Sequence, residues 1–166
     1  SVCCFALIVI ESFTTMNQKN LQKSIEIAKQ LFPTCYAKRV RYQTFHFAFL
    51  WKKNRLISIG QHRVDKPSAK ALYFAKRFNV EKQKKYPYIH AEISAIQKVW
   101  SKVYIDNSIS MVVLRLSRDE TFQNSKPCKG CSTILSALGI DDVCWSNASG
   151  NIVSGNTILL EQDIIS

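Results

Sequence analysis

Hydrophobic and polar positions repeat with a helical period in two segments of the chain, residues 17–32 and 89–100. In residues 17–32, for example, Leu21, Ile25 and Ala28 lie three or four positions apart, which predicts an amphipathic helix that ends before Pro33. A second helix is predicted in this way at residues 89–100, and a short helix at residues 67–78, of which 69–78 fits best. Pro127 at the start and Gly139 at the end predict a further helix over residues 127–138.

Short runs rich in aromatic and β-branched residues predict the strands. Residues 42–50 and 56–59 flank a polar Lys52-Lys53-Asn54 turn and are expected to form a β-hairpin that closes at Gly60. Residues 111–116 form a run suited to a strand buried on both faces, with Arg115 near its carboxyl end. Further strands are predicted at residues 143–145 and 157–160, with loops at 79–87 and 119–126 and a turn-rich connection at 147–155.

Helices and strands therefore alternate, which predicts a single α/β domain over residues 1–166, with one sheet covered by helices on both faces. A chain of 166 residues with 46% hydrophobic residues can bury one core, which excludes intrinsic disorder. The longest apolar run, from Val2 to Ile10, is too short to span a membrane, so we expect a soluble protein with no membrane partner. Residues 1–15 are either a non-native extension or an edge strand.

Six cysteines include one closely spaced pair, Cys128 and Cys131. The opening apolar segment has no basic region before it and no small-residue cleavage site after it, so we expect a cytoplasmic, reducing location. In that setting the pair is a candidate for metal binding or redox chemistry rather than a structural disulfide.

The net charge of +11 is concentrated in one half of the sequence. Residues 1–89 contain 17 basic and 4 acidic side chains, a net +13, and residues 90–166 contain 6 and 8, a net −2. Such a basic segment with interleaved aromatic residues is typical of polyanion binding. The candidate nucleic-acid-binding residues are Arg39, Arg41, Lys52, Lys53, Arg55, Arg63, Lys84, Lys85, Tyr86 and Tyr88.

Two motifs carry the candidate chemistry: His90-Ala91-Glu92, and Pro127-Cys128 followed by Cys131. Imidazole and thiolate are ligands that Zn²⁺ prefers, and three protein ligands leave one coordination position open for a catalytic water. His90, Cys128 and Cys131 each fall at the start of a predicted helix, where the helix dipole favours thiolates. Glu92 is then placed to act as the general acid and base.

These motifs resemble the zinc-dependent cytidine and deoxycytidylate deaminases, and residues 85–96 with 125–128 are similar to small phage-type members. The resemblance covers residues 42–160 and implies a three-layer α/β/α fold with a mixed sheet of five strands. It also implies that Ala91 and Cys128, next to Pro127, offer backbone groups to the base, and that a polar residue ending the second strand contacts the sugar. Gln61 or His62 is the candidate for that contact.

The chain departs from the deoxycytidylate deaminase pattern at Ser94, where these enzymes commonly have Asn, so nucleotide recognition by Ser94 is a further expectation. Arg115, near the end of a central strand, is a candidate for phosphate binding. His46, inside a predicted strand, is expected to be structural.

The sequence therefore predicts a zinc-dependent deaminase that converts cytosine to uracil with release of ammonia. The basic half favours cytosine in nucleic acid, above all single-stranded DNA, as the substrate. The alternatives are a deaminase of free deoxycytidine nucleotides and a non-catalytic, zinc-stabilised nucleic-acid-binding module. Whether the protein is a monomer or a homo-oligomer is left open.

Overall fold

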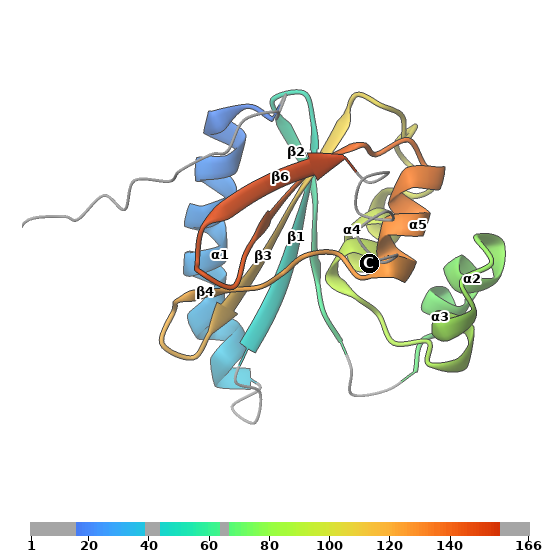
Figure 1. The fold of residues 1–166 in the computed structure, drawn as a ribbon, viewed down its shortest axis with the longest axis horizontal. Helices are drawn as coiled ribbons and strands as arrows, with labels where there is room; N and C mark the ends of the chain where they lie inside the picture. Colours follow the sequence, from blue (N-terminus) through green and yellow to red (C-terminus); the bar gives the residue numbers. More distant parts are fainter. Residues whose placement is uncertain (1–15, 39–43, 64–66, 157–166) are drawn as a thin grey trace, which may run out of the picture.

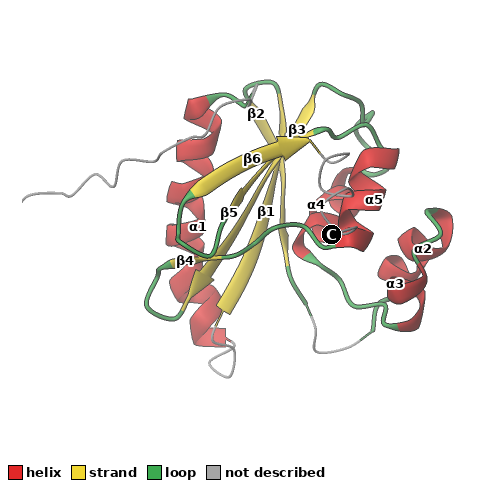
Figure 2. Cartoon of the chain, viewed as in Figure 1, coloured by secondary structure: helices red, strands yellow, loops and turns green. Residues whose placement is uncertain are grey.

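The computed structural model describes residues 16–38, 44–63 and 67–156 (Figures 1 and 2). Its helices are α1 (Gln18–Lys38), α2 (Ala69–Arg77), α3 (Glu81–Lys85), α4 (Ala91–Val99) and α5 (Lys129–Ala137). Its strands are β1 (Thr44–Lys52), β2 (Arg55–Gln61), β3 (Ile109–Ser117), β4 (Phe122–Gln123), β5 (Asp142–Ser146) and β6 (Ile152–Asn156). No helix in these ranges is long and apolar enough to cross a membrane.

The strands form one mixed sheet in the order β2-β1-β3-β5-β6, and β4 pairs with β3 beside this path. Strand β1 is antiparallel to both β2 and β3, whereas β3 and β5 are parallel. Figure 1 shows α1 on one face of the sheet and the other helices on the opposite face, as the α/β/α prediction requires. The predicted fold class is therefore confirmed.

The strand count differs from the five that were predicted. Strand β4 has only two residues and lies in the predicted loop 119–126, because a strand this short shows no periodicity in the sequence. Strand β6 occupies part of the segment 147–155 that was predicted to be turn-rich. Its Gly155 indicated a turn, but this residue instead packs against the Trp145 ring. The predicted strand 157–160 and the opening segment 1–15 lie outside the described residues.

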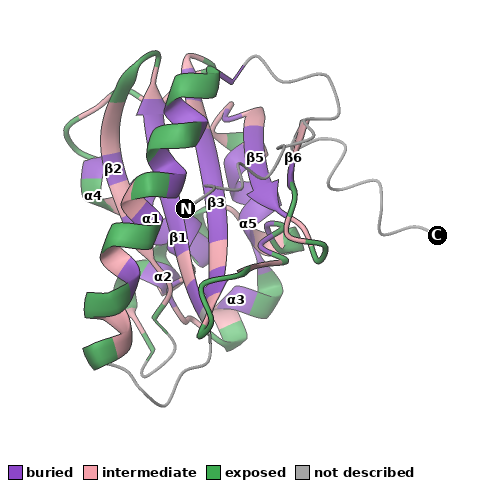
Figure 3. Ribbon diagram, turned by 90° about the vertical axis from the view of Figure 1, so that its left-hand side faces the viewer, coloured by how far each residue is buried: buried purple, intermediate pink, exposed green. Residues whose placement is uncertain are grey.

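Helix α1 covers one face of the sheet through Leu21, Ile25, Ala28 and Phe32, all buried. Its other side is exposed (Figure 3). These residues belong to a core cluster with the α1-facing residues of the sheet, which include Phe45, Phe47, Phe49, Trp51, Val112, Leu114 and Leu116. This alternation along β1 leaves the intervening residues to face the other layer.

The prediction that helix α1 ends before Pro33 is wrong, because the helix continues to Lys38. An internal proline removes one backbone hydrogen bond and costs about 3 kcal/mol. Packing of the last turn offsets this cost: Tyr36 stacks on Phe32, and both rings contact Phe45 edge-on. Tertiary contacts, rather than local propensity, therefore set the length of this helix.

Helices α4 and α5 pack on the opposite face of the sheet. Ile93 and Ile96 of α4 and Ile134 and Leu135 of α5 are buried in a second core cluster. The sheet contributes Ala48, Leu50, Met111, Val113, Val143 and Trp145 to this cluster. The close packing of α4 on β2 depends on Gly60, because a Cβ there would lie 2.0 Å from the backbone oxygen of Ala91.

Candidate metal centre and active site

Two helix N-termini meet on the α4 side of the sheet and bring the two sequence motifs together. His90 is the N-cap of α4 and Cys128 is the N-cap of α5, both with extended backbone. The Cys128 sulfur accepts a hydrogen bond from the backbone N–H of Cys131 at 3.5 Å. The candidate ligands therefore sit at the positive ends of two helix dipoles, where thiolates are favoured.

The distances among the three candidate ligands fit a tetrahedral metal ion. Their ligand atoms lie within 4.8 Å of one another, and His90 Nδ1 lies 3.4 Å from Cys128 Sγ and 3.3 Å from Cys131 Sγ. Zinc bonds of ordinary length at a tetrahedral angle separate nitrogen and sulfur by about 3.6 Å. The donor set and its spacing thus fit Zn²⁺ bound through Nδ1 of His90.

The two cysteine thiols have opposite pKa shifts. The hydrogen bond from the Cys131 thiol, together with His90, lowers the pKa of Cys128 to about 4. The same hydrogen bond and burial raise the pKa of Cys131 well above its usual range. Because zinc binds thiolates, we expect metal binding to displace the remaining proton from Cys131.

Glu92 lies in the first turn of α4 and is buried, and its side chain makes a hydrogen bond with Cys131. Burial raises its pKa to about 7, while His90 and a hydrogen bond with Cys131 oppose the shift. A carboxyl group that titrates near neutral pH can both accept and return a proton, which is the property a general acid and base requires.

Three polar residues, His46, His62 and Arg115, form a row along the sheet beside the three candidate metal ligands, and this row is called the sheet wall below. His46 of β1 pairs with Arg115 of β3 in the strand register, and the backbone N–H of His62 donates to the His46 carbonyl. The ring centroids of His62 and His90 are 5.2 Å apart, and those of His46 and His62 are 5.3 Å apart. His46 was expected to be only structural, because its place in this row depends on the cross-strand register.

His46 should make the protein sensitive to acid. Burial, then His62, Arg115 and His90, lower its pKa to about 3, so the folded state keeps His46 neutral while the unfolded chain binds a proton below about pH 6.5. Stability contributed by neutral His46 is therefore present above that pH and is lost as the pH falls toward 3. Allowing for partial exposure, the loss between pH 7.5 and 5 is roughly 1–2 kcal/mol.

Urea unfolding of the wild type and of His46→Gln at both pH values measures this effect. Between pH 7.5 and 5, His46→Gln should lose less unfolding free energy than the wild type, by the amount assigned above to His46. All other titrating groups are common to the two proteins and drop out of this comparison. Equal losses in the two proteins would contradict the pKa assignment.

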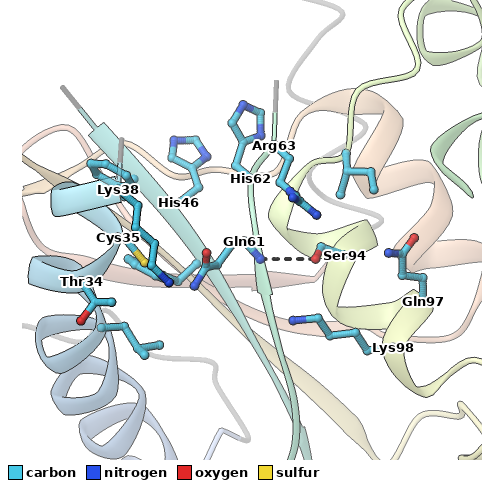
Figure 4. Close-up of a pocket in the computed structure, with 14 residues that line it drawn as sticks. Thr34, Cys35, Lys38, His46, Gln61, His62, Arg63, Ser94, Gln97 and Lys98 are labelled. Carbon is cyan, nitrogen blue, oxygen red and sulfur yellow. Dashed lines mark hydrogen bonds between the residues drawn. The ribbon is translucent and has the colours of Figure 1, made fainter. Parts of the chain in front are cut away.

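The two candidates for the sugar contact point to different faces of the sheet. Gln61 pairs with Phe47, and its side chain points toward Cys35 of α1, away from α4 (Figure 4). His62 lies on the α4 side, next to His90. Ser94 is buried, and its hydroxyl accepts a hydrogen bond from the Gln61 backbone N–H at 3.4 Å, so it ties α4 to the end of β2.

A pocket of about 570 Å³ extends along this edge of the sheet, between α1 and α4. Its lining includes Lys38, Gln61, His62, Arg63 and Ser94 (Figure 4). A second pocket of about 420 Å³ lies on the other side of His90 and Cys128, and Tyr86 and Tyr88 line it. Both volumes fall in the range of small-molecule sites.

The candidate nucleic-acid-binding residues do not form one continuous track. Lys52, Lys53 and Arg55 lie at the β1–β2 turn, about 20 Å along the strand from His46 at roughly 3.3 Å per residue. Arg63 lines the larger pocket and Tyr86 and Tyr88 line the smaller one, whereas neither lining includes Lys84 or Lys85. Arg39 and Arg41 are outside the described residues. Two of the lysines have local partners, since Lys84 contacts Glu81 at 2.5 Å and Lys52 lies 3.9 Å from Asp106.

Ala91 and Pro127 flank the ligands, as the motifs imply. Ala91 is fully buried and begins α4. The carbonyl of Pro127 accepts a hydrogen bond from the Ser132 hydroxyl at 3.4 Å, which holds it against the first turn of α5.

Gln83 also belongs to the site, although no sequence motif indicated it. It belongs to α3, a helix inside the segment 79–87 that was predicted to be a loop. Its side-chain amide lies 3.7 Å from Cys131 Sγ and 3.9 Å from Cys128 Sγ. The segment is too short and too charged to show a helical period.

The fold has one mixed sheet between helices, and its His/Cys/Cys set lies between two helix N-termini, so the chain belongs to a class of layered α/β proteins whose donor set fits zinc. Residues 17–147 match the family model described as the cytidine and deoxycytidylate deaminase zinc-binding region. This match covers most of the sequence, so the chain belongs to the cytidine and deoxycytidylate deaminase family, as the motifs indicated.

Among solved structures, the chain is similar to the crystal structure of dCMP deaminase from the cyanophage S-TIM5 in apo form. The TM-score is 0.49 and the sequence identity is 15%, over 89% of this chain and 94% of that chain. No curated protein sequence matches the chain.

Proposed function

We propose that the protein hydrolyses the amino group of cytosine in a free deoxycytidine nucleotide, giving uracil and ammonia. The observation that carries this proposal is the buried Glu92 beside a His90, Cys128 and Cys131 group whose distances fit zinc. Zinc held by these three residues supplies an activated water molecule as the nucleophile.

Glu92 performs the proton transfers in this proposal. Its carboxylate takes a proton from the attacking water and gives it to N3 of cytosine. It then takes the second proton and passes it to the amino nitrogen at C4, which leaves as ammonia. A pKa of about 7 lets Glu92 serve in both directions at neutral pH.

The sheet wall provides the contacts for the sugar and the phosphate. His62 adjoins His90 on the cluster side of β2, so it is the better candidate for the sugar contact than Gln61. Arg115 lies next to His46 in the same row, and its guanidinium Nη1 lies 3.4 Å from the Asn124 carbonyl. An arginine that pairs with His46 in this row suits a phosphate group, which it can bind through two hydrogen bonds.

The distribution of charge supports a free nucleotide over a polynucleotide. Single-stranded DNA needs a basic groove that follows several phosphates from the active site. Lys52, Lys53 and Arg55 lie instead at the β1–β2 turn, at the opposite end of β1 from His46. Because these lysines and this arginine account for part of the net charge, a large positive charge here does not by itself imply a nucleic-acid track.

The substrate assay compares deoxycytidine, its mono- and triphosphate, and single- and double-stranded oligonucleotides that contain cytosine, with uracil as the readout. We expect turnover of a free nucleotide and little turnover of the oligonucleotides. Conversion of single-stranded DNA alone would reverse the proposal in favour of the polynucleotide alternative.

Arg115→Gln tests the phosphate contact. Loss of a charge-assisted hydrogen bond should raise KM for deoxycytidine monophosphate about tenfold to a hundredfold and leave the kinetics with deoxycytidine unchanged. Arg118→Gln is the matched control, because the Arg118 guanidinium stacks over Tyr36 of α1 instead. An equal effect of Arg115→Gln on both substrates would contradict a phosphate contact.

A further inference from the structure

We propose that Gln83 is a positioning residue of the metal centre, whose side-chain amide donates one hydrogen bond to each of the two cysteine sulfurs. This inference rests on the zinc ligation in the proposed function. It adds a residue from outside the two sequence motifs, and it assigns α3 a role in the site.

Gln83 is buried although every other residue of its helix is charged. Helix α3 has the sequence Glu-Lys-Gln-Lys-Lys, and Gln83 is its only buried residue, with 8% of its surface exposed. A buried amide needs hydrogen-bond partners, because leaving them out costs about 1–3 kcal/mol. The cysteine sulfurs are the acceptors that the described structure offers to its Nε2.

The chemistry of the amide fixes which end faces the sulfurs. The NH₂ group has two donors, which matches the two acceptor sulfurs at 3.9 and 3.7 Å. The reversed orientation would bring the amide oxygen toward two thiolates and would leave both donors without these acceptors. The donating orientation is therefore the one compatible with thiolate ligands.

Backbone contacts hold Gln83 in this place. Its N–H donates to the carbonyl of Val80 at 3.1 Å, and the N–H of Val80 in turn donates to Ala75 of α2 at 2.9 Å. Gly130, between the two cysteines, leaves room for the approach. A Cβ at Gly130 would lie 2.8 Å from both Gln83 Nε2 and Val80 Cγ1.

Two thiolates give the centre a concentrated negative charge, and hydrogen bonds to sulfur spread that charge. A sulfur that accepts a hydrogen bond is also a weaker electron donor to a bound metal. Gln83 therefore orients both cysteines and lowers the electron density on their sulfurs. These two effects can be measured separately, the first as metal affinity and the second as an optical spectrum.

The experiment uses Gln83→Met, which keeps the length of the side chain and removes the donors. Zinc affinity is measured by competition with a chelator, and Co²⁺ is used as the optical probe of the thiolates. We expect the zinc affinity to fall about tenfold to a hundredfold, as for other outer partners of metal ligands. We also expect the sulfur-to-cobalt charge-transfer band to move to longer wavelength.

Gln83→Glu is a second variant, and its carboxylate should weaken zinc binding further by repelling the thiolates. Lys85→Met is the matched control on the exposed side of the same helix, with wild-type affinity and spectrum expected. Wild-type affinity in Gln83→Met, or a loss of affinity without a band shift, would overturn the proposal. If the wild-type chain itself bound no zinc, the proposed function would fail together with it.

Discussion

Glu92→Gln should lower kcat by about two to four orders of magnitude, the usual contribution of a general acid and base. Glutamine matches the shape of the carboxyl group and can occupy the same buried position, but it cannot take or return a proton. The variant should bind as much zinc as the wild type, because the proposed ligands His90, Cys128 and Cys131 are intact. It should also be at least as stable at pH 8, since it removes a carboxyl group whose ionisation burial opposes.

Steady-state kinetics and elemental analysis of the same preparation check this expectation. Glu81→Gln is the matched control, because Glu81 is an exposed carboxylate on nearby α3 that pairs with Lys84. Cys131→Ala gives the contrasting pattern, in which metal and activity are lost together. Undiminished turnover in Glu92→Gln would refute the role of this carboxyl group.

The metal centre was predictable from the sequence because each half of it is local. His90 and Glu92 lie two residues apart at one helix start, and Cys128 and Cys131 lie three apart at another. Each helix start fixes the relative positions of its own residues. That the two helix starts come together in the fold could not be predicted from either segment alone. The resemblance to a known family implied it.

The sheet wall was only partly predictable, because it depends on strand register. His62 and Arg115 were candidates from their places at strand ends, but His46 was expected to be structural. Whether Gln61 or His62 faces the cluster also depends on the register, since successive residues of a strand point to opposite faces. The pairing of Phe47 with Gln61 settles the orientation of Gln61.

Gln83 and the length of α1 were not predictable for a different reason. Both depend on tertiary contacts that oppose a local signal: a short, charged segment in one case and an internal proline in the other. The sequence likewise shows how many basic residues there are but not how they are distributed over the surface. Lys52, Lys53 and Arg55 illustrate this, because they lie at the β1–β2 turn, whereas His46, at the other end of β1, lies in the sheet wall.

Gly60→Ala should impair both stability and catalysis, although residue 60 bears no functional group. The added Cβ would lie 2.0 Å from the Ala91 oxygen and 2.4 Å from the Ala95 nitrogen. Both are backbone atoms of α4, so the clash cannot be relieved by a side-chain rotation. The helix must move away from β2, at a cost of about 3 kcal/mol, the upper end of the usual range for overpacking.

This movement would displace the start of α4, which holds His90, Ala91 and Glu92. A displacement of about 1 Å can reduce an enzymatic rate about a hundredfold, so kcat/KM should fall by that order in Gly60→Ala. Gly139→Ala is the control: its φ of 75° makes alanine strained, but its Cβ would lie no closer than 3.9 Å to the Asn107 nitrogen. We expect Gly139→Ala to lose stability in urea unfolding while keeping its kcat/KM. If Gly60→Ala also kept its kcat/KM, α4 would not be the element through which the edge strand positions the site.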